Sequence, residues 1–129
     1  DEILGINGVI AIPHLGASTP ESEDNCATMA AKELIDYIEN GNIENSVNFP
    51  TATMPRSGDK RICVMHKNIP NMLTEITSVV AGDNINIENL INKSKGDYAY
   101  TMLDICAADY DTIMSKIKSI NGVVRVRII

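Results

Sequence analysis

The chain has 129 residues, of which 44% are hydrophobic and 22% are charged, values ordinary for one globular domain or a small domain with an attached segment. The net charge of −6 argues against a nucleic-acid partner. No apolar run approaches the about 20 residues of a membrane span, and no signal peptide is recognisable, so we expect no membrane partner.

The acidic charge is concentrated in the first half of the chain. Residues 1–59 hold ten acidic and two basic side chains, whereas residues 60–129 hold seven acidic and nine basic ones. This asymmetry indicates two units. Because the chain begins with Asp rather than Met, we expect it to be a piece of a longer protein.

The cysteines Cys26, Cys63 and Cys106 lie far apart and are odd in number. Disulfide frameworks and zinc sites need paired, closely spaced cysteines. We therefore expect no metal site, and reduced thiols that serve as small apolar residues in a cytoplasmic protein.

Residues 1–40 predict one strand followed by one helix. The run Val9–Ile12 is apolar and β-branched, as in a strand buried on both faces of a parallel sheet. Thr19 can cap a helix that starts at Pro20, and Gly41 can end it. The helix carries one apolar stripe, formed by Cys26, Ala27, Ala30, Ala31, Leu34, Ile35 and Ile38. A single strand–helix pair cannot bury this stripe, so we expect it to need a larger α/β body.

Residues 41–60 are rich in Asn, Ser, Thr, Gly and Pro and show no sustained period, which predicts a linker. From residue 61 the pattern becomes regular and predicts a domain over 61–129. The expected strands contain residues 61–66, 85–87, 99–105 and 124–128, and the expected helices start at Pro70 and after Asp109. This β-α-β-β-α-β order predicts a ferredoxin-like α+β fold. Its sheet has an open edge, through which we expect a homo-oligomer to form.

His14 directly follows the first predicted strand. Ligands and catalytic groups gather at the carboxyl ends of strands in open α/β sheets. A histidine side chain titrates near neutrality and suits proton exchange with a substrate hydroxyl. The alternative is a histidine that only forms a hydrogen bond within its loop.

A second group of candidate residues surrounds the first helix of the regular region. His66 ends the preceding strand, Asn68 lies in the loop, and Asn86 starts the next strand. The helix N-terminus offers free N–H groups to a carboxylate, so an imidazole and an amide beside it could hold a small amino acid. Asn86 could contribute from a neighbouring chain. The alternative is that Asn68 and Asn86 are cap and turn residues. We expect ordinary turn, edge or covering roles for Asn84, Asn89, Asn92, Tyr98 and Tyr100.

Two stretches together resemble known families. IPHLGASTPESEDNCA, residues 12–27, resembles the C-terminal catalytic signature of D-isomer-specific 2-hydroxyacid dehydrogenases. RICVMHKNIPNMLTEITSVVAGDNINIENL, residues 61–90, resembles the opening of an ACT regulatory domain, and SVNFP at 46–50 joins the two. The resemblance implies a strand–helix remnant of the catalytic, NAD-binding region followed by an ACT domain.

The resemblance also implies roles for individual residues. His14 would exchange the proton of the substrate hydroxyl while NAD takes the hydride. His66, Asn68 and Asn86 would hold an amino-acid effector, L-serine, across a two-fold interface. The family's catalytic Arg, its acidic partner and its glycine-rich cofactor loop have no counterpart here, so this piece alone should be inactive. The ligand loop carries Asn71 where the family usually has Gly, and Asn tolerates a left-handed backbone better than most residues.

Three functional hypotheses remain open from the sequence. The chain is the regulatory end of an NAD-dependent dehydrogenase, a stand-alone amino-acid-sensing module, or a domain that only dimerises.

Overall fold

The computed structural model describes residues 2–106 and 109–129, and it divides into a first unit up to Lys32 and a second unit, Glu33–Ile129, called the sheet unit below. The helices are α1 Pro20–Asn40, α2 Met72–Gly82 and α3 Tyr110–Lys118, and the strands are β1 Lys60–Lys67, β2 Ile87–Lys95, β3 Tyr98–Ile105 and β4 Val123–Ile128. None of the helices in the described ranges is long and apolar enough to cross a bilayer.

The four strands form one antiparallel sheet in the order β2-β3-β1-β4. The strands β1 and β2, which α2 connects, are separated in the sheet by β3, and the strands β3 and β4, which α3 connects, are separated by β1, as the ferredoxin-like plan requires. The predicted β-α-β-β-α-β fold of the regular region is therefore confirmed. The outer strands are β2 and β4.

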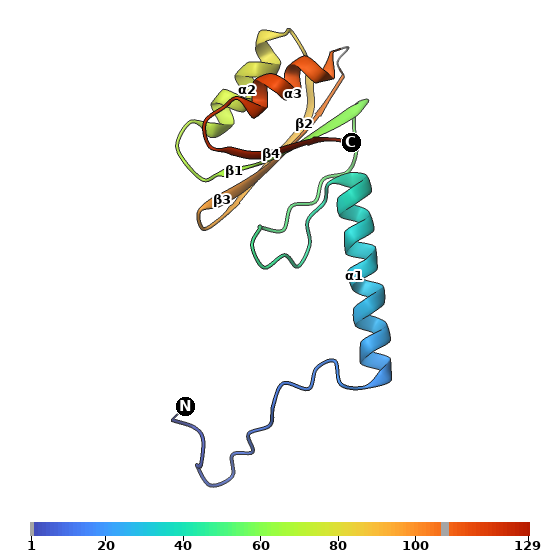
Figure 1. The fold of residues 1–129 in the computed structure, drawn as a ribbon, viewed down its shortest axis with the longest axis vertical. Coiled ribbons are helices and arrows are strands. Elements are labelled where there is room, and N and C mark those ends of the chain that lie inside the picture. Colours follow the sequence, from blue (N-terminus) through green and yellow to red (C-terminus); the bar gives the residue numbers. More distant parts are fainter. Residues whose placement is uncertain (1, 107–108) are drawn as a thin grey trace. The chain divides into compact units, whose positions relative to one another are not determined.

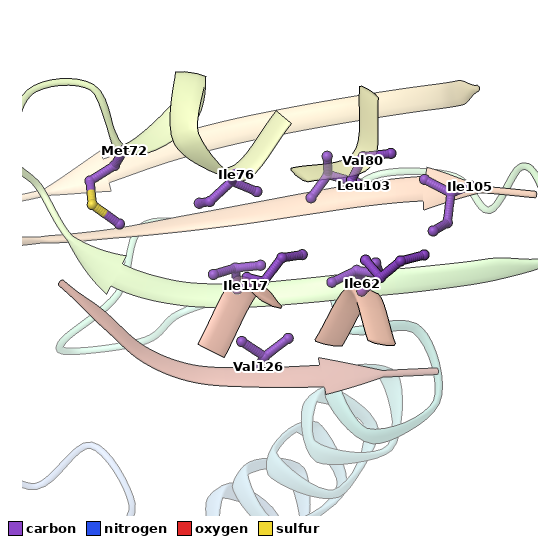
Figure 2. Close-up of a cluster of buried hydrophobic side chains, with 10 residues drawn as sticks. Ile62, Met72, Ile76, Val80, Leu103, Ile105, Ile117 and Val126 are labelled. Atoms are coloured by element: carbon purple, nitrogen blue, oxygen red, sulfur yellow. The ribbon is translucent and has the colours of Figure 1, made fainter. Parts of the chain in front are cut away.

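The helices α2 and α3 both cover one face of this sheet (Figure 1). Alternate strand residues point toward them, and the close-up shows these side chains meeting those of the helices (Figure 2). The buried cluster consists of Ile62, Val64, Met72, Ile76, Val80, Leu103, Ile105, Ile113, Ile117 and Val126. Within each strand and helix, these buried residues recur at the spacing typical of a strand or a helix with one buried face.

The opposite face of the sheet is covered by residues 41–54, which composition alone indicated as a linker. Ile43 and Ala52 pair in an isolated antiparallel bridge. A second buried cluster is formed by Ile43, Ala52, Met54, Cys63, Tyr100 and Met102. The Tyr100 hydroxyl donates a 2.7 Å hydrogen bond to the Gly41 carbonyl. Tyr100 thus covers a sheet face as expected, and the sheet is buried on both sides.

Gly41 connects α1 to this covering segment at a position where only glycine fits. Its φ is +74°, and a Cβ there would lie 2.5 Å from the buried Sγ of Cys63. We expect Gly41→Ala to lower the free energy of unfolding by about 2–3 kcal/mol, because left-handed strain and overpacking add. Urea denaturation measures the change. Gly96→Ala is the matched control: φ is +58° with nothing within 4 Å, so only the strain, about 1 kcal/mol, should appear.

The C-terminal end of α1 is held by arginines from other parts of the sequence. The last turn of α1 has no basic residue of its own. Its last four carbonyl groups instead accept hydrogen bonds from Arg127 (at Tyr37 and Ile38), Arg56 (at Glu39) and Arg61 (at Asn40). Cations at a helix C-terminus satisfy free carbonyl groups and oppose the helix dipole. This end of α1 is therefore fixed to the sheet.

Arg61 belongs to a buried ion pair with Asp104. Both side chains are fully buried, and Nε of Arg61 lies 2.6 Å from Oδ1 of Asp104. The backbone N–H of Ser57 donates to the same carboxylate at 2.7 Å. Burial alone would raise the pKa of Asp104, but the hydrogen bonds from Arg61 and Ser57 outweigh it and hold the pKa below its ordinary value.

The first unit agrees with the sequence prediction in its helix but not in its strand. α1 begins at Pro20, with the Ser22 N–H donating to Oγ1 of Thr19, and ends before Gly41 as predicted. The predicted strand at Val9–Ile12 is wrong: the segment is irregular and Ile10 is 87% exposed. A strand needs neighbours for its N–H and C=O groups, and no described strand pairs with this one.

Several predicted apolar positions are also exposed. The α1 stripe stays open to solvent, with no buried residue in the helix. In β4, Val124 has the alternation of the buried Val126, which predicts an inward position, but it is 59% exposed, because the register of the β1–β4 pair shifts between Met65 and His66. Of the cysteines, Cys63 is buried and burial raises its pKa, whereas Cys26 and Cys106 are exposed rather than used as core residues.

Candidate functional site

The N-terminus of α2 provides the backbone of the candidate site. Asn71, just before the helix, has φ 69° and ψ −5°, a left-handed conformation, and its side chain makes no capping hydrogen bond. The first N–H groups of α2 therefore have no side-chain acceptor. A helix start of this kind suits a carboxylate, because its N–H groups and the positive end of the helix dipole point at the same place. The structure also confirms that asparagine accepts the left-handed position here.

His66 is the last residue but one of β1, shortly before this helix start, but its ring is enclosed. The residue is 2% exposed. Nδ1 lies 2.8 Å from the Lys67 carbonyl oxygen, and Nε2 lies 2.9 Å from Oγ1 of Thr101. Both ring nitrogens are thus hydrogen-bonded within the chain. In this conformation the ring offers no free nitrogen to a ligand.

Asn68 links the loop before α2 to the turn between β2 and β3. Its backbone N–H donates to the Asp97 carbonyl at 2.8 Å, and its Nδ2 donates to the Gly96 carbonyl at 3.1 Å. The side chain is exposed. Asn68 therefore fixes the loop beside the helix start, and its carbonyl Oδ1 has no hydrogen-bond partner among the described residues.

Asn86 lies at the other end of the sheet from His66. His66 pairs with Ala99 of β3, whereas Ile87, which follows Asn86, pairs with Ile105 of the same strand. Six residues of strand separate these positions, a distance on the order of 20 Å. Nδ2 of Asn86 donates to Oε1 of Glu88. One chain therefore brings together His66 and Asn68 but not Asn86, which could reach them only from a second copy.

The structure adds two residues that the sequence interpretation did not select. Oγ1 of Thr101, on β3, lies between Nε2 of His66 and Oδ1 of Asn92, on β2, and donates to the latter at 3.0 Å. Asn92 had been expected to be an ordinary edge residue. The signal in the sequence was the hydroxyl of Thr101 in an alternating series of the 99–105 strand whose other members, Ala99, Leu103 and Ile105, are apolar.

His14 lies in the first unit, in the irregular segment before α1. The side chain is exposed and makes no hydrogen bond with the residues that the structure describes. Within the described ranges, no group of three or more His, Cys, Asp and Glu side chains is placed to hold a metal ion.

Comparison with known proteins finds relatives whose sequences are similar to this chain over both units. The chain is 31% identical over 124 residues to D-3-phosphoglycerate dehydrogenase of Haemophilus influenzae and 32% identical over 126 residues to that of Escherichia coli. It is 30% identical over 125 residues to D-3-phosphoglycerate dehydrogenase 1 of Saccharomyces cerevisiae. These matches cover 93–95% of this chain.

The chain is related to the D-3-phosphoglycerate dehydrogenases. It spans 26–30% of the length of these phosphoglycerate dehydrogenase relatives. The resemblance that the two sequence stretches indicated is confirmed by a single alignment that includes both His14 and the sheet unit. No family model matches the chain. Among solved structures, the ACT domain of the GTP pyrophosphokinase of Chlorobium tepidum aligns with 54% of this chain and 95% of its own, at 23% identity and a TM-score of 0.49.

Proposed function

We propose that this chain is the regulatory C-terminal part of an NAD-dependent D-3-phosphoglycerate dehydrogenase, which oxidises 3-phosphoglycerate to 3-phosphohydroxypyruvate in the first step of L-serine biosynthesis. The observation that supports it is the similarity to phosphoglycerate dehydrogenases over 95% of the chain. In this proposal residues 1–40 belong to the catalytic region, 41–60 form the linker and 61–129 form an ACT domain of a cytoplasmic enzyme.

In the whole enzyme His14 exchanges the proton of the substrate hydroxyl. NAD supplies the acceptor for the hydride. The part of the chain that the structure describes does not fit NAD: the strand–helix turn between β1 and α2, residues 68–71, contains no glycine and no glycine-rich phosphate loop. We therefore assign no cofactor residue here, and this piece alone should be inactive.

The sheet unit binds an amino-acid effector at the start of α2. The uncapped N–H groups of α2 receive the ligand carboxylate, and Oδ1 of Asn68 accepts from its ammonium group. A second copy pairs through the outer strand β2 and brings its own Asn86 to the His66 end. L-serine, the end product of the pathway, is the proposed ligand.

Thermal denaturation tests this effector role. At 100 times its dissociation constant a ligand stabilises by about 2.7 kcal/mol. For a domain of this size we expect L-serine to raise the Tm by on the order of 10 °C. D-serine is the matched control, and sedimentation velocity of the same samples should show a dimer. No shift with L-serine, glycine or other small L-amino acids would contradict the effector role.

A second candidate function, a domain that dimerises without binding a ligand, is favoured by one observation. Both ring nitrogens of His66 already have hydrogen-bond partners inside the chain. This hypothesis predicts a dimer by sedimentation with no ligand-dependent change in Tm. A stand-alone sensing module would instead show the ligand shift without any dehydrogenase activity in the whole protein.

A further inference from the structure

The two ends of the covering segment are held together by one side chain. Arg61, on β1, donates from Nη1 to the Asn40 carbonyl at 2.7 Å and from Nη2 to the Pro55 carbonyl at 2.9 Å. The residues between these two carbonyl groups therefore form a loop with a closed neck, as in an Ω-loop. Arg61 is itself fixed by its buried ion pair with Asp104, so the neck is part of the folded sheet.

Further hydrogen bonds reinforce this neck. The Tyr100 hydroxyl donates to the Gly41 carbonyl at 2.7 Å. Nδ2 of Asn42 donates to the carboxylate of Asp36 on α1, and Oδ1 of Asn42 accepts from the Met54 N–H at 3.1 Å. The neck therefore extends to Asn42 on one side and to Met54 on the other. Residues 43–53, which lie beyond it, are called the lid below.

The lid has few hydrogen bonds to the rest of the sheet unit. Its backbone–backbone hydrogen bonds, 2.9 Å each, link Ile43 to Ala52 within the lid, and none joins it to a strand among the described residues. Two exposed side-chain hydrogen bonds connect it to Lys95 of β2 and to Glu33 of α1. Such bonds contribute little to closure, because water can replace either partner.

Apolar packing holds the lid closed, but only a few side chains take part. Ile43 and Ala52 are 7% and 1% exposed and belong to the second buried cluster, with Tyr100 and Met102 of β3 beneath. Phe49 is only partly buried, with its ring centroid 6.5 Å from that of Tyr100. A segment with few backbone hydrogen bonds and little buried apolar area opens at a lower free energy than global unfolding requires.

We propose that the lid opens and closes as a unit over the second face of the sheet, while the strands, α2 and α3 stay folded and the neck stays closed. Opening exposes Ala52 and uncovers Tyr100 and Met102, so the fold contains a gated apolar surface. Cys63 lies beneath the neck, where a Cβ on Gly41 would be 2.5 Å from its Sγ, and it stays enclosed. This inference depends on neither the proposed effector function nor the proposed dehydrogenase activity.

Native-state hydrogen exchange tests whether the lid opens separately. We expect the Ile43 and Ala52 amide protons to exchange at least about tenfold faster than those of the central strands β1 and β3, after correction for intrinsic rates. Their exchange should also depend less on urea, because lid opening exposes less surface than global unfolding. Equal protection and equal urea dependence in the lid and in the two strands would overturn the proposal.

Two matched variants separate lid opening from global unfolding. Ile43→Val and Ile117→Val shorten the same buried side chain by one carbon on opposite faces of the sheet. Each should favour the state that exposes its side chain by about two- to tenfold. Ile43→Val should speed Ala52 exchange by this factor, whereas Ile117→Val should speed exchange in β1 and β3 and leave Ala52 unchanged. If Ile117→Val speeds Ala52 exchange as much as it speeds exchange in the strands, the lid opens only when the whole unit unfolds.

Thiol labelling with iodoacetamide tests whether the neck stays closed. Ala52→Cys places a thiol in the lid, Cys63 reports on the neck, and the exposed Cys26 and Cys106 react first as internal references. We expect the thiol introduced by Ala52→Cys to react at least about tenfold faster than that of Cys63. Equal rates would overturn the closed neck. If Ala52→Cys does not fold, the exchange of the wild type and of the two valine variants still decides whether the lid opens.

Discussion

Replacing Asp104 with alanine is expected to lower the free energy of unfolding of the sheet unit by about 3–5 kcal/mol, because it leaves a buried guanidinium without its counter-ion. Arg61 and Asp104 have fully buried side chains joined by hydrogen bonds of 2.6 and 2.8 Å. Arg61 also donates to the carbonyls of Asn40 and Pro55, so its displacement would loosen the end of α1 and the covering segment together. Urea denaturation measures the loss.

Two controls show whether burial is the cause. Asp83→Ala removes the partner of Lys116 in a pair whose side chains are 30% and 46% exposed, and it should cost only about 0–1 kcal/mol. The double variant Arg61→Met/Asp104→Leu removes both charges but also the Arg61 hydrogen bonds to the Asn40 and Pro55 carbonyls, so it should be less stable than the wild type but more stable than Asp104→Ala. If Asp104→Ala lowers the free energy of unfolding no more than Asp83→Ala does, the stabilising role of the buried Arg61–Asp104 pair is contradicted.

The same pair makes stability depend on acidity. The pKa of Asp104 in the folded chain is lower than its ordinary value. A carboxylate with a depressed folded pKa contributes stability that is fully present above the unfolded pKa, about 3.9, and is lost as the pH falls through the folded pKa. The difference between the wild type and Asp104→Ala should therefore shrink in denaturation experiments below about pH 4.

The fold of residues 61–129 could be predicted from the sequence because each of its elements is marked by residues within or directly beside it. The elements of residues 61–129 each carry their own period, cap or turn residue: Asp109 caps α3 through the Thr112 N–H, and Gly96 has the positive φ that the β2–β3 turn needs. Consecutive elements of this kind admit few topologies. The order of the elements therefore led directly to the ferredoxin-like sheet.

The second face of the sheet could not be predicted in this way, because its contacts are distant in the sequence. Residues 41–54 have a composition typical of a linker, and nothing local indicates that Ile43, Ala52 and Met54 become buried against Tyr100. The Arg61–Asp104 pair is equally non-local, since 43 positions separate its members. At Val9–Ile12 the local signal indicates a strand, but pairing needs a neighbour.

In the candidate site, too, the features with local sequence signals could be predicted and those that depend on distant contacts could not. The left-handed Asn71 and the helix start beside His66 follow from local sequence, and the structure has both. The hydrogen bond of His66 Nε2 is made with Thr101, which reaches the ring only through the pairing of β1 with β3. A histidine at a strand end indicated a ligand contact, whereas the paired strands turn its ring away from solvent.

Under the proposed dehydrogenase function, His14→Ala in the full-length protein is expected to reduce kcat by about 10²–10⁴-fold, the contribution that a positioned general acid–base group makes. Proton exchange with the substrate hydroxyl must accompany hydride transfer, and alanine can neither take nor return a proton. KM for 3-phosphoglycerate should change much less than kcat, because the lost interaction forms mainly in the transition state. Steady-state kinetics of NADH formation measures both.

The control for His14→Ala must lie in the same segment and leave the proton chemistry intact. Asn7→Ala changes an exposed side chain of the first unit and should keep wild-type turnover. His14→Gln keeps a hydrogen-bonding side chain of similar reach but cannot carry out the proton exchange, so it should be as slow as His14→Ala. Recovery of activity in His14→Gln would reduce His14 to a hydrogen-bonding role, and unchanged turnover in His14→Ala would remove it from the mechanism.

The same variant separates loss of catalysis from loss of regulation. His14 lies in the first unit, whereas the candidate effector residues lie in the sheet unit. His14→Ala should therefore leave the affinity of the chain for L-serine unchanged.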